Sequence, residues 1–110
     1  MSPLVFAAPP IVTAPVRGSS GRVAIQRIFC VGRNYEAHAR EMGVAVDREA
    51  PFYFTKSAEH CVPSGSTVAY PPGTSNYHFE LELVVVIGAP AFRVSGESAL
   101  ESVLGYKCRK

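Results

Sequence analysis

Residues 77–88 read YHFELELVVVIG, and this stretch decides the fold because it combines β-strand composition with two closely spaced carboxylates. Side chains alternate across a strand, so Glu80 and Glu82 share one face with His78. The opposite face is wholly apolar and consists of Phe79, Leu81, Leu83, Val85 and Ile87. The stretch therefore predicts a buried strand whose apolar face lies against a hydrophobic core and whose other face carries two acids.

Two interpretations of the acidic face are open from the pattern alone. Same-face neighbours on a strand have Cα atoms roughly 7 Å apart, so both carboxylates can approach one divalent cation. Alternatively, Glu80 and Glu82 form the solvated face of an antiparallel edge strand with Lys or Arg opposite them. Residues 84–87 are apolar on both faces, which is typical of a covered central strand and argues against a solvated edge, so the pattern alone leaves both interpretations open.

Length, composition and charge limit the classes of function. The chain has 110 residues, which suffices for one domain. Its formal net charge of +2 comes from scattered residues without a basic run, so we expect no nucleic-acid partner. The apolar runs are far too short to cross a bilayer, so we expect a soluble protein with no membrane partner.

Cysteine usage and the N-terminal charge bear on localisation. Cys30, Cys61 and Cys108 are widely spaced and odd in number, which predicts reduced thiols in an intracellular protein, with Cys30 in the core of its strand. Residues 1–35 contain four Arg and no acid, as in an organelle transit peptide, but their prolines would break its amphipathic helix. The sequence therefore favours the cytoplasm, and the mitochondrion stays the alternative.

The remaining chain predicts short strands joined by turn-rich loops. Residues 1–24 are rich in Pro, Gly and Ser and predict an extended arm or edge hairpin. We expect strands at 25–31, 52–55, 67–70 and 77–88, and helices at 34–42 and 97–104. Asn34 and Ser95 would cap the two helices, and Gly43 and Gly105 would end them. The fold class is therefore α+β, mainly β, with short helices.

The expected helix at 34–42 carries a second candidate site. His38 and Glu41 are three residues apart and so share one helical face. A carboxylate beside an imidazole favours its protonated form, which suits a general base; the alternative is an ordinary surface pair. Lys56 follows an apolar strand and could bind a substrate carboxylate, or simply extend its stem along the surface.

These signals together resemble the fumarylacetoacetate hydrolase family, most closely its fumarylpyruvate hydrolase and acylpyruvase branch. The resemblance rests on IFCVGRNY (28–35), His38, Glu41, FTK (54–56), YPPG (70–73), HFELEL (78–83) and VIG (86–88), in this order. It implies a mixed β-roll or sandwich, a homodimer, and hydrolysis of the C–C bond of acylpyruvates such as fumarylpyruvate. Oxaloacetate decarboxylation and dienoate isomerisation are the nearest alternatives.

The resemblance also implies roles for individual residues. Glu80 and Glu82 fall on two ligands of Mg²⁺ or Mn²⁺, which carboxylate oxygens suit. His38 and Glu41 match a dyad on a lid helix, in which the histidine activates water and the glutamate orients it. The match also implies that Lys56, Arg33 and Asn34 contact the substrate.

One departure from the family pattern concerns the third metal ligand. The family supplies an Asp on a later strand, after a Gly-Tyr pair that resembles Gly105 and Tyr106, whereas residues 107–110 here read KCRK. Residues 25–110 are thus expected to form the N-terminal part of the catalytic domain, with the C-terminal part absent. A non-catalytic, truncated relative that acts as an interaction partner stays an alternative.

Overall fold

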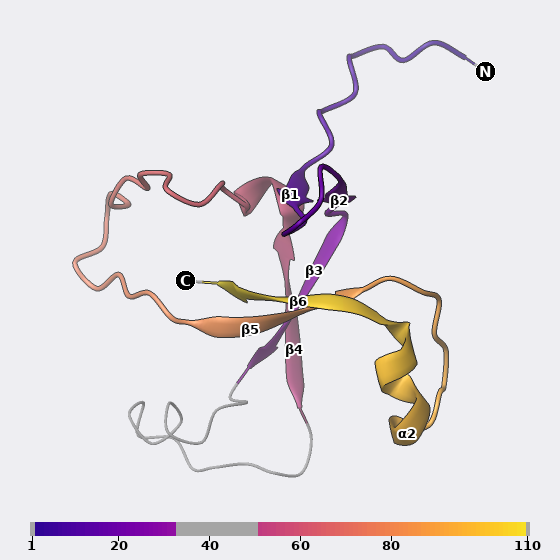
Figure 1. The fold of residues 1–110 in the computed structure, drawn as a ribbon. Coiled ribbons are helices and arrows are strands. Elements are labelled where there is room, and N and C mark those ends of the chain that lie inside the picture. Colours follow the sequence, from indigo (N-terminus) through magenta and orange to yellow (C-terminus); the bar gives the residue numbers. More distant parts are fainter. Residues whose placement is uncertain (1, 33–50, 110) are drawn as a thin grey trace. The chain divides into compact units, whose positions relative to one another are not determined.

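The computed structural model describes residues 2–32 and 51–109, and these fold mainly into antiparallel strand pairs with short helices (Figure 1). The elements are β1 (Thr13–Pro15), β2 (Arg22–Ala24), β3 (Arg27–Gly32), β4 (Phe52–Ser57), η1 (Ala58–His60), β5 (Glu82–Ile87), α2 (Gly96–Ala99), η2 (Leu100–Ser102) and β6 (Val103–Arg109). The chain forms two compact units, Met1–Thr67 and Val68–Lys110, and each is described here by itself.

The first unit opens with the hairpin β1–β2, which lies within the segment expected to be an extended arm or edge hairpin. Thr13 is opposite Ala24 in the register. The Arg22 guanidinium donates from Nε to the Thr13 hydroxyl at 2.7 Å and from Nη2 to the Thr13 carbonyl at 3.2 Å. Gly18 adopts a φ of 76° between the strands, a conformation that glycine reaches without steric cost.

The second pair of the first unit is β3–β4, in register from Arg27 opposite Ser57 to Gly32 opposite Phe52. Both strands were expected from their β-branched and aromatic composition, and both are confirmed; β3 begins two residues later and ends one residue later than expected, and β4 is two residues longer. Cys30 was expected in the core of its strand and is half-buried in β3. The six positions of β4 are all exposed.

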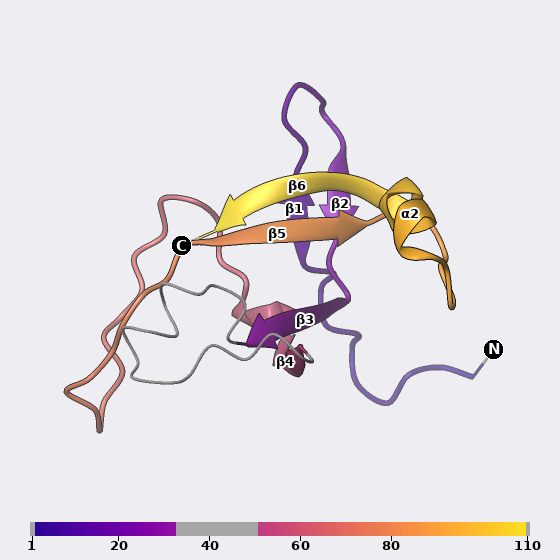
Figure 2. The same cartoon turned by 90° about the horizontal axis from the view of Figure 1, so that it is seen from below.

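The second unit contains β5–β6, whose strands lie side by side with α2 at one end of the pair (Figure 2). Glu82 is opposite Arg109 and Ile87 is opposite Val103, with an irregularity between Val86 and Ile87. Beyond the strand, the Gly88 amide donates to the Ser102 carbonyl at 2.9 Å, which extends the pairing toward the helices.

The expected helix at 97–104 is wrong in its length. Ser95 caps α2 as predicted, with its hydroxyl accepting from the Ser98 amide at 3.3 Å, but α2 ends at Ala99. A 3₁₀ turn follows, and Val103–Arg109 is a strand that contains the expected stop, Gly105. Pairing with β5, which is distant in sequence, outweighs the local helical preference here.

Two further strand predictions need correction. Residues 67–70 are irregular, because no ladder partner among the described residues pairs with them and a Pro-Pro-Gly turn with Gly73 at a φ of 81° follows. The strand expected at 77–88 begins only at Glu82, so Glu80 precedes it. The two acids therefore do not both stand on a strand.

The expected burial of β5 is also wrong for the described part of the chain. Glu82, Val84 and Val86 are half-buried, whereas the face meant to form the core is open, with Val85 46% and Ile87 64% exposed. Among the described residues no large side chain is fully buried. An apolar face of this kind contributes stability only when something covers it.

Candidate functional site

Four of the candidate residues lie outside the part of the chain that the structure describes. Arg33, Asn34, His38 and Glu41 all fall within residues 33–50, as does the helix expected at 34–42. Their roles therefore remain predictions. The described residues contribute Lys56 in the first unit, and Glu80 and Glu82 in the second.

Glu82 is the first residue of β5 and is half-buried. Its register partner is Arg109, and Lys107 is opposite Val84, the next residue on the same face. The register thus places a basic residue opposite one of the two acids, as the edge-strand interpretation expects. The backbone position of Glu82 is thus compatible with either a metal ligand or a cross-strand charge pair.

The segment that leads to Glu80 is braced by its own side chains. The Asn76 side-chain oxygen accepts a hydrogen bond from His78 Nε2, and the Asn76 amide donates to the Thr74 hydroxyl at 3.1 Å. The rings of Tyr70 and Tyr77 pack edge to face, with their centroids 5.5 Å apart. The residues before Glu80 therefore do not form the expected strand, and side-chain hydrogen bonds hold them instead.

Sequence reasoning missed the Asn76 contact with His78. The signal was present, because a Thr-Ser-Asn run after Pro-Pro-Gly is typical of a turn in which short polar side chains bond to nearby groups. Reading the run as the start of a strand placed His78 on the acidic face. The structure places it in an irregular segment that leads into β5.

The donor set can be compared with the needs of a hard divalent cation. Mg²⁺ and Mn²⁺ favour carboxylate oxygens, so Glu80 and Glu82 fit in chemical type. Within residues 2–32 and 51–109, no group of three His, Cys, Asp or Glu side chains gathers as a metal site would require. The described residues thus supply two ligands of suitable chemistry and an incomplete set in number.

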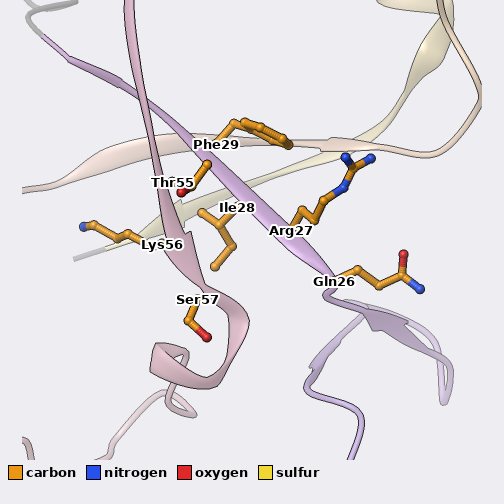
Figure 3. Close-up of a pocket in the computed structure, with 7 residues that line it drawn as sticks. All are labelled: Gln26, Arg27, Ile28, Phe29, Thr55, Lys56 and Ser57. Atoms are coloured by element: carbon orange, nitrogen blue, oxygen red, sulfur yellow. The ribbon is translucent and has the colours of Figure 1, made fainter.

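Lys56 occupies β4, opposite Ile28, and its ammonium lies 5.9 Å from the centroid of the Phe54 ring. It lines an open pocket of about 420 Å³ (Figure 3). The other lining residues are Gln26, Arg27, Ile28, Phe29, Thr55 and Ser57. Lys56 and Arg27 project from different strands in different directions, so Lys56 can meet an anion without sharing it with Arg27.

The helices of the described residues bear on the membrane prediction. They are short, and none has the length and apolar character needed to cross a bilayer.

Comparison with known proteins adds a family match. Residues 27–108 match the family model described as "Fumarylacetoacetate (FAA) hydrolase C-terminal". "Fumarylpyruvate hydrolase" of Ralstonia sp is 60% identical over 67 residues, which cover 59% of this chain and 35% of the relative. "Oxaloacetate tautomerase FAHD1, mitochondrial" of Bos taurus is 46% identical over 81 residues, which cover 74% of this chain and 36% of the relative.

A solved structure extends the similarity to the fold. The crystal structure of fumarylpyruvate hydrolase from Pseudomonas aeruginosa, in complex with Mn²⁺ and pyruvate, matches with a TM-score of 0.87 and 45% identity. The match covers 96% of this chain and 47% of that one. The mainly-β fold type expected from the sequence is thereby confirmed, and the chain spans less than half the length of these relatives.

Proposed function

The chain belongs to the fumarylacetoacetate hydrolase family, and on this premise we propose that it forms part of a metal-dependent hydrolase that cleaves a C–C bond of acylpyruvates such as fumarylpyruvate. The observation that carries the proposal is the Glu80-Leu81-Glu82 sequence at the start of β5, within a fold shared with a fumarylpyruvate hydrolase crystallised with Mn²⁺ and pyruvate. The segment from 25 to 110 would be the N-terminal part of the catalytic domain.

Glu80 and Glu82 would hold Mg²⁺ or Mn²⁺, together with a ligand from outside the described residues. A bound divalent ion supplies positive charge that stabilises oxyanions of the substrate. Two neighbouring carboxylates repel each other unless a cation lies between them, so their own chemistry supports this role. Lys56 would bind a substrate carboxylate as a compact positive charge, with Arg33 and Asn34 as further substrate contacts.

His38 would accept a proton from water, and Glu41 would orient its imidazole. The resulting hydroxide attacks the carbonyl carbon of the acyl group. The bond from that carbon to the adjacent methylene then breaks, its electron pair leaves with the pyruvate half as an enolate, and the proton returns from His38. The products are pyruvate and the free acid of the acyl group, so one water is consumed for each bond cleaved.

Oxaloacetate chemistry is the nearest alternative within the same family. Decarboxylation, isomerisation of dienoic acids and the tautomerisation named for the Bos taurus relative all pass through an enolate. Glu80, Glu82 and Lys56 would serve each of them equally. The role of His38 separates the alternatives, because hydrolysis needs an activated water as a reactant.

A second candidate function is a non-catalytic partner. The exposed apolar face of β5–β6, on which Val85 stands opposite Tyr106, favours it. In this role the occupant of the face would be a full-length subunit of the same family, with which the chain pairs through its exposed sheet edges. A homodimer, as the family resemblance implies, is the proposed assembly of the catalytic form. The cytoplasm is the proposed location, with the mitochondrion as the alternative.

A complementation assay tests both candidates. The chain, alone and mixed with the second half of the Ralstonia fumarylpyruvate hydrolase, is given fumarylpyruvate, and the loss of its absorbance is followed with Mg²⁺, with Mn²⁺ and with a chelator. We expect little turnover from the chain alone, turnover from the mixture with metal, and loss of most of it in Glu80→Gln, Glu82→Gln and His38→Ala. Full turnover in chelator, or in the His38 variant, would contradict the mechanism. Binding without turnover would favour the non-catalytic role.

A further inference from the structure

Three side chains of β4 form a row on one face of the β3–β4 pair. Phe52, Phe54 and Lys56 alternate along the strand and therefore point to the same side. The two ring centroids are 5.8 Å apart with planes inclined by 30°, and the Lys56 ammonium is 5.9 Å from the Phe54 centroid. Each member of the row thus contacts the next, and the ammonium is the end of the row.

The residues of β3 that stand opposite this row increase in size along the strand. The register places Gly32 opposite Phe52, Cys30 opposite Phe54 and Ile28 opposite Lys56, so the partners grow from the first to the last. A Cβ atom added at Gly32 would lie 2.1 Å from Cδ1 of the Phe52 ring. The ring therefore occupies the space that only a glycine leaves open, which fixes the end of the row away from the lysine.

The contact with the Phe54 ring reduces the entropy that Lys56 loses when it binds an anion. A free lysine side chain loses rotamer entropy when a ligand immobilises it. An ammonium near an exposed aromatic ring is attracted to it, so Phe54 restrains the side chain before a ligand arrives. The ring satisfies no hydrogen-bond donor of the ammonium, and these donors stay available to a carboxylate. Lys56 is thus partly ordered, and it is one of the residues that line the pocket.

We propose that Phe54, braced by Phe52 on Gly32, is a positioning residue that holds the Lys56 ammonium ready for a substrate carboxylate. The inference rests on the proposed function, because it takes Lys56 as the carboxylate contact. It goes beyond that function by assigning the ordering of Lys56 to an aromatic row that lies on β4 itself.

The test uses the 110-residue chain with pyruvate as the probe in saturating Mg²⁺, and it has two readouts. The first is the proton shift of the Lys56 ε-methylene, which a ring beneath it moves upfield. The second is the pyruvate dissociation constant. We expect Phe54→Leu to abolish the upfield shift and to weaken pyruvate binding about two- to fivefold, as the loss of an exposed cation–π contact would. Phe54→Tyr keeps a ring and should retain both.

Two further variants guard against a general loss of structure. Gly32→Ala displaces the Phe52 ring without changing Phe54 or Lys56, and it should reduce both effects in part. Phe92→Leu removes a ring from beneath another cation, Arg93, at 5.3 Å in the other unit, and it should change neither readout. Loss of pyruvate binding in the Phe92 variant would mean that the readout follows general stability, and would overturn the inference.

The outcomes separate this inference from the function on which it rests. If Phe54→Leu binds pyruvate as tightly as the wild type, or keeps the upfield ε-methylene shift, the positioning role is overturned. If Lys56→Met at the same time binds pyruvate more weakly, the contact between Lys56 and the carboxylate stands. Equal affinity in Lys56→Met and the wild type overturns the contact itself, and the positioning role falls with it.

Discussion

The pairs β3–β4 and β5–β6 are both two-stranded and antiparallel, yet their side chains make different kinds of contact. In β3–β4 the long cationic side chains lie on rings of their own strand, Lys56 on Phe54 and Arg27 on Phe29 at 5.5 Å. In β5–β6 the exposed face is apolar, with Val85 and Ile87 open. Both pairs leave apolar side chains exposed, but those of the first include rings that contact its own cations.

This difference divides the chemistry as well. Aromatic rings beside a cation give a binding site for an anion that local sequence alone can build. Carboxylates at the start of β5 need a cation and additional ligands, which local sequence does not supply. The sharpest experiments are therefore those that treat the two pairs alike and look for different results.

The largest expected difference concerns metal binding. Glu80→Gln and Glu82→Gln should each weaken Mn²⁺ binding by about tenfold or more, because each removes one anionic ligand. Lys56→Met in β3–β4 should leave it unchanged. Titration calorimetry measures the affinity, and Glu101→Gln, an exposed acid of the second unit, is the matched control. If Glu101→Gln weakens Mn²⁺ binding as much as Glu82→Gln does, the loss reflects the net charge of the protein, and the proposed difference between the two pairs is wrong.

The same division explains which elements the sequence could predict. β3 and β4 are recognisable because their β-branched and aromatic residues and their boundaries at Gly32 and Pro51 are local signals. The sequence does not predict β6, and it assigns the first two residues of that strand to a helix, because the pairing with β5 joins residues far apart in the chain, from Glu82 opposite Arg109 to Ile87 opposite Val103. Local propensity carries no information about such a partner.

The sequence also predicted only part of the candidate site. Residue type and spacing indicated Glu80, Glu82 and Lys56, but not how each is held. The position of Glu80 before the strand depends on the turn built around Asn76, which short polar side chains form through bonds that a strand pattern does not contain. The ring beneath Lys56 follows from strand alternation and could have been predicted.

A smaller difference is expected from adding one methyl group to each pair. At Gly88 a new Cβ would lie 2.6 Å from the Leu104 Cβ, an atom fixed to the backbone, whereas at Gly32 it would meet the Phe52 ring, which can turn aside. Gly88→Ala should therefore destabilise β5–β6 by about 1–3 kcal/mol, as overpacking does, and Gly32→Ala should cost β3–β4 less. Amide hydrogen exchange of the strand residues measures each effect.

A matched glycine keeps this test specific. Gly96 has no atom within 4 Å of its added Cβ, so Gly96→Ala should leave the exchange of β5 amides unchanged or slower. If Gly32→Ala accelerates exchange more than Gly88→Ala, the aromatic ring is the less adaptable neighbour and the comparison is reversed.

The smallest effect is expected at Ser95, where a local contact supports the second pair. Its hydroxyl accepts from the Ser98 amide at 3.3 Å and begins the short helix that leads through η2 into β6. Ser95→Ala should cost about 0.5–1 kcal/mol at the low end of N-cap effects, because α2 is brief and exposed. Ser95→Asp, which can accept the same bond, should retain stability. Exchange of the Ser98 and Val103 amides measures the loss. Acceleration at Ser98 alone would mean that the cap holds only the helix, whereas acceleration at both would mean that β6 depends on a local contact after all.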